Sequence, residues 1–106
     1  MKVELLWWEG CPSHPEALEE LERVLREEGE NAEVELLEVE SDDQAHRERF
    51  PGSPTLRLDG VDAIASPEGE PVSLTCRIYH LRDGRVSATP DPEDLRDAVR
   101  RINANR

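Results

Sequence analysis

Hydrophobic residues in the first forty positions follow two different spacings. Val3–Trp8 is an apolar run of strand length, as expected for a strand that is covered on both faces. Glu16–Glu28 has apolar residues at helical spacing, which predicts an amphipathic helix ending at Gly29. Its apolar positions are Ala17, Leu18, Leu21, Val24 and Leu25. Glu33–Glu40 places glutamates between and around its apolar residues, and such a charged strand favours the edge of a sheet.

Turn signals divide the next part of the chain. The sequence S-D-D-Q at 41–44 is a capping box, which predicts a short helix that ends near Phe50. Asp59-Gly60 stands between two alternating segments of Thr55–Ile64 and therefore predicts a tight hairpin. Ser66–Pro71 is expected to be a loop.

The last third of the chain predicts a second hairpin and a final helix. Leu74–Leu81 and Arg85–Ala88 flank Asp83-Gly84, a second possible hairpin turn. Asp91 followed by Pro92 is a favourable helix start, because the acid caps the helix and proline suits its first position. The inner positions of this helix are Leu95, Ala98, Val99 and Ile102.

The resulting order of elements is β-α-β-α-β-β-(β)-α. Strands that alternate with helices and then form a hairpin predict an α/β layer fold with a mixed sheet. The chain has 106 residues, without repeats or a linker, so we expect a single domain.

Composition narrows the classes of function. The net charge is −12, and residues 1–50 alone carry 16 acidic side chains. An acidic surface repels phosphate backbones and anionic lipids, so we expect neither nucleic-acid nor membrane partners. No apolar stretch approaches roughly 18 residues and no signal peptide is recognised, which indicates a cytoplasmic protein. In that reducing compartment, Cys11 and Cys76 are not expected to form a permanent structural disulfide.

Cys11 lies where the first strand meets the first helix, between Gly10 and Pro12. Backbone N–H groups and the helix dipole stabilise an anion at such a position, and the thiolate is the reactive form of cysteine. The alternative is a small buried residue that packs at a turn. We interpret Cys11 as reactive rather than buried.

Two short motifs, together with the order of elements, resemble the thioredoxin superfamily. Residues 7–14, W-W-E-G-C-P-S-H, match the position of that family's W-C-x-x-C region. Ser53-Pro54-Thr55 resembles the family's cis-proline and the threonine that follows it. The resemblance covers nearly the whole chain. It implies one thioredoxin-like domain over residues 1–106, a three-layer α/β/α sandwich with a mixed β-sheet.

The resemblance also implies a redox site around Cys11. In that fold the cis-proline faces the active-site sulfur, and the residue before it, here Ser53, offers backbone groups to an extended substrate. The implied activity is thiol–disulfide exchange with a disulfide- or thiol-bearing protein or a small thiol, and we expect no cofactor. The implied substrate-binding residues are Trp8, Pro12, Ser53, Pro54 and Thr55. Further residues that can line a groove, but that resemble ordinary surface positions, are Arg77, Tyr79 and Arg82.

The chain departs from the family at the second cysteine of C-x-x-C, which is His14. A single thiol cannot release a mixed disulfide through its neighbour, so a small thiol or a distant cysteine must do so. Cys76 is the distant candidate, and we predict a labile disulfide between Cys11 and Cys76. The alternative is that Cys76 is a small buried hydrophobic residue. Protonated His14 can favour the Cys11 thiolate or carry a proton to a leaving thiol, unless it is an exposed histidine without function.

Two other classes of function stay open. Cys11-x-x-His14 and Cys76-x-x-x-His80 have the internal spacing of zinc-ligand pairs. However, Cys76 and His80 would be about 13 Å apart on an extended strand, so a zinc site requires this segment to curl. Two thiolates alone can bind a soft ion such as mercury or arsenite, which is typical of a metal or metalloid detoxification protein. If Cys11 is unreactive, the chain is instead a non-catalytic thioredoxin-fold adaptor.

Overall fold

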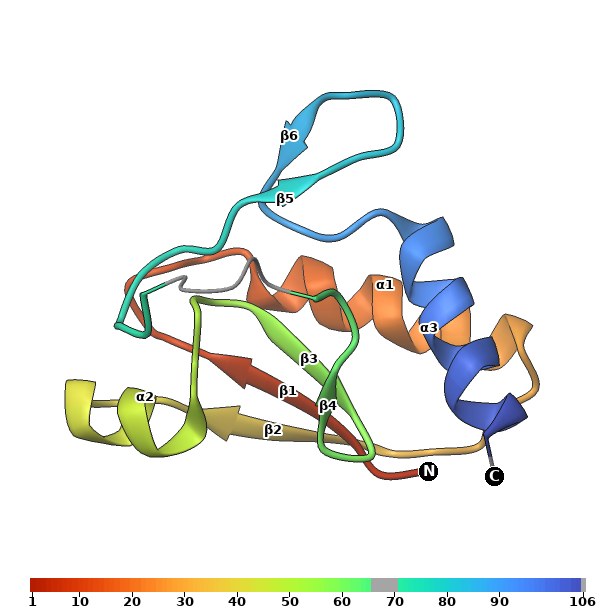
Figure 1. Ribbon diagram of the computed structural model, residues 1–106, viewed down its shortest axis with the longest axis horizontal. Helices are drawn as coiled ribbons and strands as arrows, with labels where there is room; N and C mark the ends of the chain where they lie inside the picture. Colours follow the sequence, from red (N-terminus) through yellow and green to blue (C-terminus); the bar gives the residue numbers. More distant parts are fainter. Residues whose placement is uncertain (66–70, 106) are drawn as a thin grey trace.

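The structure is a computed structural model that describes residues 1–65 and 71–105. These residues form a four-stranded mixed sheet, a separate two-stranded hairpin and three helices (Figure 1). The main sheet has the spatial order β2-β1-β3-β4 and consists of β1 (Val3–Trp7), β2 (Val34–Glu38), β3 (Thr55–Leu58) and β4 (Val61–Asp62). The helices are α1 (His14–Glu27), α2 (Asp42–Glu48) and α3 (Pro92–Ala104). The expected loop at Ser66–Pro71 lies outside the described residues except for its last position.

Strand β1 lies inside the sheet, parallel to β2 and antiparallel to β3. Leu5 has Leu36 of β2 on one side and Leu56 of β3 on the other. This central place agrees with the apolar run predicted for a strand covered on both faces. The charged strand β2 forms an edge of the sheet, as its glutamates indicated. The expectation of a mixed α/β sheet is confirmed.

Capping residues and a glycine mark the ends of the helices. Helix α1 begins at His14, two residues before the expected start, and Gly29 beyond its end has a φ of 71°. The Ser41 hydroxyl caps α2 by accepting a hydrogen bond from the Gln44 N–H at 3.1 Å. Asp91 caps α3 in the same way. The predicted caps are therefore confirmed.

The tight hairpin between β3 and β4 is also confirmed. Asp59 and Gly60 have φ values of 51° and 81°, so both turn residues are left-handed. This combination suits a two-residue hairpin, because its twist matches that of the flanking strands.

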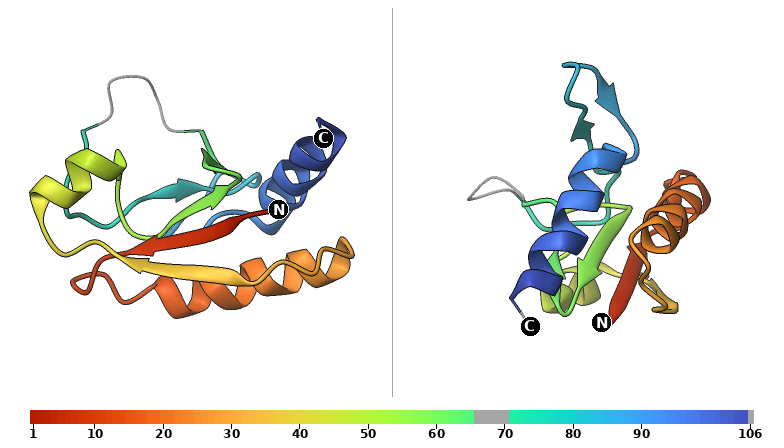
Figure 2. Two further views of the ribbon diagram at one scale, coloured as in Figure 1. Left: turned by 90° about the horizontal axis from the view of Figure 1, so that it is seen from below. Right: turned by 90° about the vertical axis from the view of Figure 1, so that its right-hand side faces the viewer.

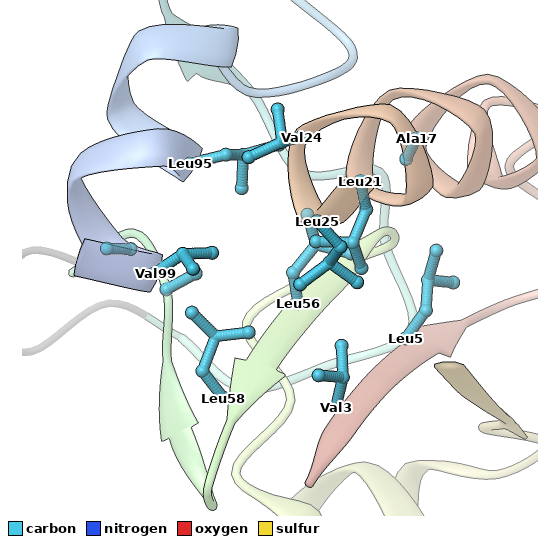
Figure 3. Packing of buried hydrophobic residues seen from close by; sticks show 12 residues of the cluster. Val3, Leu5, Ala17, Leu21, Val24, Leu25, Leu56, Leu58, Leu95 and Val99 are labelled. Atoms are coloured by element: carbon cyan, nitrogen blue, oxygen red, sulfur yellow. The ribbon is translucent and has the colours of Figure 1, made fainter. Parts of the chain in front are cut away.

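The helices cover both faces of the sheet (Figure 2). Successive residues of a strand point to opposite faces, so Leu5 and Leu6 belong to different hydrophobic clusters. The larger cluster joins β1 and β3 to the apolar faces of α1 and α3 (Figure 3). The smaller cluster places Ala45 of α2 and Phe50 against Leu6. Together the clusters pack against both faces of β1, and the loop that follows this strand carries Cys11.

The second hairpin is much shorter than expected. Its strands are β5 (Tyr79–His80) and β6 (Val86–Ser87), and it projects from the main body (Figure 1). The chain before β5 does not extend this hairpin, because its hydrogen bonds go to the segment that precedes β3. Within the described part of the chain, none of the helices combines the length and apolar character needed to cross a bilayer.

Candidate functional site

Cys11 lies in a tight loop between β1 and α1. Its backbone N–H donates to the carbonyl of Trp8 at 3.0 Å, which turns the chain back after the strand. The indole of Trp8 lies over Gly10, where any side chain would collide with the ring. The Cys11 side chain is only 3% exposed. The interpretation of Cys11 as an unburied residue is therefore wrong, because residues from distant parts of the chain cover it.

The sulfur of Cys11 contacts two polar groups. It lies 3.5 Å from the carbonyl oxygen of Ser53, to which its thiol donates, and 3.5 Å from Oγ of Ser13. The Ser53 hydroxyl in turn accepts a hydrogen bond from the backbone N–H of Trp8 at 3.0 Å. The Ser53–Pro54 peptide bond is cis, as predicted, and lies against Cys11. Ser53 thus joins the start of β3 to the cysteine loop.

Cys76 lies beside this junction. Ser53 N–H donates to the carbonyl of Thr75, and Arg77 N–H donates to the carbonyl of Ser53, both at 2.8 Å. These two bonds form an isolated parallel bridge between Ser53 and Cys76. A side-chain hydrogen bond with Cys11 raises the pKa of Cys76 to about 11, and desolvation and a charge on Cys11 add to this effect. The structure therefore places both cysteines beside Ser53.

Both cysteines are free thiols. Cys76 is exposed, so the alternative of a small buried hydrophobic residue is wrong for this position. The predicted disulfide stays a prediction.

Arg77 anchors the segment that carries Cys76. Its side chain is buried, 2.9 Å from a carboxylate oxygen of Asp62, and donates to the carbonyl of Ile64 at 2.6 Å. The guanidinium carbon lies 4.7 Å from the ring centre of Tyr79, whose hydroxyl donates to the carbonyl of Pro54. Sequence reasoning did not distinguish Arg77 and Tyr79 from surface residues, and it missed Asp62. Their roles depend on contacts between distant segments, which no local pattern predicts.

His14 starts α1 and stacks on Trp7, with ring centres 4.1 Å apart and planes inclined by 17°. Its Nδ1 atom is buried and has no hydrogen-bond partner among residues 1–65 and 71–105. The contacts of His14 therefore tie it to the end of β1. Its role in proton transfer at Cys11 stays a prediction.

The implied substrate-binding residues differ in accessibility. Pro12 is exposed and Trp8 is half-buried, whereas Ser53, Pro54 and Thr55 are buried. The Thr55 hydroxyl donates to the carbonyl of Gly52 at 2.6 Å. Both backbone hydrogen-bonding groups of Ser53 are used by the segment around Cys76, rather than being open to a substrate.

The ligands of the zinc hypothesis do not assemble. Across the part of the chain that the structure describes, no group of three or more His, Cys, Asp or Glu side chains is placed to hold a metal ion. Cys11 and Cys76 both adjoin Ser53 as free thiols. His80 instead lies on β5, and His14 stacks on Trp7.

Comparison of the chain with protein-family models, curated proteins and solved structures found no match. The function must therefore be inferred from the chemistry of the site itself.

Proposed function

We propose that the protein is a thiol–disulfide oxidoreductase of thioredoxin-like fold in which Cys11 and Cys76 form the redox pair. The observation that carries this proposal is the convergence of two free thiols on Ser53: the Cys11 thiol donates to the Ser53 carbonyl, and Cys76 pairs with Ser53 in the isolated bridge. Such a pair can close into a disulfide within one molecule, which removes the need for a second cysteine at the position of His14. The mixed sheet, the helices on both faces and the cis-proline beside Cys11 support the thioredoxin-like assignment.

The proposed reaction has two exchange steps. The Cys11 thiolate attacks one sulfur of a substrate disulfide, forms a mixed disulfide and releases the first substrate thiolate. Cys76 then loses its proton to solvent and attacks the sulfur of Cys11, which forms the Cys11–Cys76 bond and releases the second thiolate. The protein loses two electrons and the substrate gains them. Two equivalents of an external thiol reverse the process.

The surroundings of the two sulfurs favour this division of roles. A pKa of about 11 keeps Cys76 protonated near neutral pH, so its S–H group can donate to a charged Cys11 sulfur. The Ser13 hydroxyl, at 3.5 Å, can provide a second hydrogen bond to that sulfur. Cys11 is therefore the nucleophile in this proposal, and Cys76 is the resolving thiol.

The proposal is tested by oxidising the reduced protein with a small disulfide, followed by mass spectrometry and thiol titration. The expected product is a monomer that has lost two hydrogen atoms and has no free thiol. Cys76→Ser should stop at a stable adduct on Cys11, and Cys11→Ser is the matched control in which exchange is lost. Formation of intermolecular dimers alone, or no reaction of the wild type, would overturn the proposal.

A second candidate is binding of a soft ion by the same pair. Two adjacent thiols without a third ligand nearby in the described residues suit an ion that accepts two sulfur ligands. Titration of the reduced protein with mercuric ion should then show one tight equivalent that either cysteine-to-serine variant loses. Binding of this kind without disulfide formation would favour an ion-binding function over the oxidoreductase. Inertness of both thiols in both assays would favour a non-catalytic adaptor.

A further inference from the structure

The backbone beside Cys11 is already paired with the chain itself. An extended polypeptide binds next to a strand by pairing with free N–H and C=O groups at its edge. At Ser53, the N–H donates to Thr75 and the C=O accepts from Arg77, both at 2.8 Å. The segment 75–77 therefore occupies the place that an extended substrate would need beside the Cys11 sulfur.

This segment is held firmly in its place. The guanidinium of Arg77 bonds both carboxylate oxygens of Asp62, at 2.9 and 3.2 Å, and the carbonyl of Ile64. At Gly52, an added Cβ would lie 2.9 Å from the Arg77 backbone nitrogen, which shows how closely the two segments pack. A competing peptide must break two backbone bonds and also work against this buried anchor. A segment of the same chain also has the advantage of a high effective concentration.

The Cys76 sulfur is accessible to solvent, whereas the backbone groups of Ser53 are occupied. Cys76 is exposed, whereas Cys11 is buried. Cys76 lines a hollow of about 260 Å³ together with Pro51, Pro71 and Ile78, among other residues. Such a hollow can admit a small molecule beside Cys76 without any displacement of segment 75–77.

We infer that the site accepts small disulfides and excludes extended polypeptide disulfides, because segment 75–77 fills the backbone edge beside Cys11. This inference rests on the proposed oxidoreductase function and names its substrate class. In this reaction the Cys11 and Cys76 thiols are oxidised to a disulfide, and the low-molecular-weight disulfide is reduced to two thiols. It differs from the expectation that Ser53 offers its backbone to an extended substrate.

The experiment compares two substrates with the same leaving group. Thionitrobenzoate is joined by a disulfide either to mercaptoethanol or to the cysteine of an unstructured peptide, and its release by the reduced full-length protein is followed by absorbance. Each rate is divided by the rate with free dithiothreitol, which corrects for intrinsic reactivity. The small substrate should react faster by roughly tenfold or more, since the peptide must displace two backbone hydrogen bonds.

A variant tests whether segment 75–77 causes this preference. Arg77→Lys keeps the charge but loses the hydrogen bonds from one guanidinium nitrogen to both Asp62 oxygens, so it should raise the ratio of the peptide rate to the small-substrate rate. Arg85→Lys, in the neighbouring hairpin, is the matched control and should change neither rate. If Arg77→Lys does not fold, amide exchange in the wild type replaces it. The Ser53 and Arg77 amides should then be protected, and rapid exchange would overturn the inference.

The outcomes separate the two proposals. Equal corrected rates for both substrates would overturn the inference on substrate class and leave the oxidoreductase standing. Failure of both substrates to react would overturn the proposed function itself. A faster peptide reaction in the wild type would show that segment 75–77 does not block the site.

Discussion

The behaviour of Cys76 depends on one neighbour, the sulfur of Cys11. Cys76 is exposed, and solvent alone would leave its thiol with ordinary properties. The hydrogen bond with Cys11 is the largest cause of its raised pKa, which reaches about 11. The accessible sulfur is therefore largely protonated near neutral pH, while the buried sulfur is the one surrounded by hydrogen-bond partners.

Removal of the Cys11 sulfur should make Cys76 more reactive. In Cys11→Ala the pKa of Cys76 should return toward its ordinary value, so alkylation by iodoacetamide at pH 8 should accelerate by roughly 10- to 100-fold. Peptide mapping of the labelled protein across a pH series measures this rate. Arg85→Lys, which keeps both cysteines and Ser13, should leave the Cys76 profile unchanged. An identical profile in wild type and Cys11→Ala would mean that the two thiols do not interact.

The same interaction makes the free energy of unfolding depend on pH in the alkaline range. Because the folded state raises the pKa of Cys76, it favours the protonated thiol. The resulting stabilisation is complete below the ordinary thiol pKa of about 8.5 and is lost as the pH rises toward 11. Urea unfolding of the reduced protein between these pH values should show a steeper loss of stability in the wild type than in Cys76→Ala. Parallel pH curves for the two proteins would contradict this expectation.

At the scale of elements, two turns help to position the site. The loop after β1 brings Cys11 back against Ser53, and the hairpin after β3 places Asp62 where it can hold Arg77. The hairpin turn depends on two left-handed residues, Asp59 and Gly60. The alignment of Cys76 with Cys11 therefore depends indirectly on this turn.

Gly60→Ala should destabilise the protein without a steric clash. The glycine has a φ of 81°, and no atom lies within 4 Å of an added Cβ, so the cost is conformational. We expect a loss of about 1 kcal/mol of unfolding free energy, measured by urea denaturation. Gly60→Asn is the control and should lose less, because asparagine tolerates the left-handed region better. Equal losses in the two variants would indicate a cause other than backbone conformation.

At the scale of the whole molecule, two hydrophobic clusters on opposite faces of the sheet hold the site in place. The larger cluster fixes β1 and β3 against α1 and α3, and the smaller one fixes the segment after α2. Ion pairs also join the two halves of the chain. Arg96 of α3 pairs with Glu27 of α1, and Arg100 of α3 pairs with Glu28, the residue that follows α1. These exposed pairs contribute little individually, but they reduce the excess negative charge of the first half.

The clusters make stability sensitive to single core residues. Leu5→Ala should lower the free energy of unfolding by roughly 2–5 kcal/mol, because Leu5 is fully buried at the centre of β1. Leu36→Ala is a matched control, since Leu36 is paired directly with Leu5 but is 54% exposed on the edge strand. The Leu36→Ala variant should lose no more than about 0.5 kcal/mol of unfolding free energy in the same urea titration. Similar losses in both variants would show that the inner strand is not β1.

The sequence by itself determined the helices, the first hairpin and several of their ends. Helical spacing predicted α1 and α3, the capping box predicted α2, and Asp59-Gly60 predicted the hairpin. These signals are local, because a helix, a cap or a tight turn is specified by residues within a few positions of one another. The cis bond before Pro54 also followed, but only from the resemblance of a short motif to a known family.

Only the tertiary structure decided how the site is assembled. The burial of Cys11, the exposure of Cys76 and the contact between them depend on the alignment of segment 75–77 with Ser53. That alignment is fixed by backbone hydrogen bonds and by the buried Arg77 anchor, which join positions far apart in the chain. No periodicity or turn signal encodes such contacts, since they result from the packing of complete elements against one another. The sequence therefore predicted Cys11 at the turn between the first strand and the first helix. Only the fold placed Cys76 beside Ser53 at the same site.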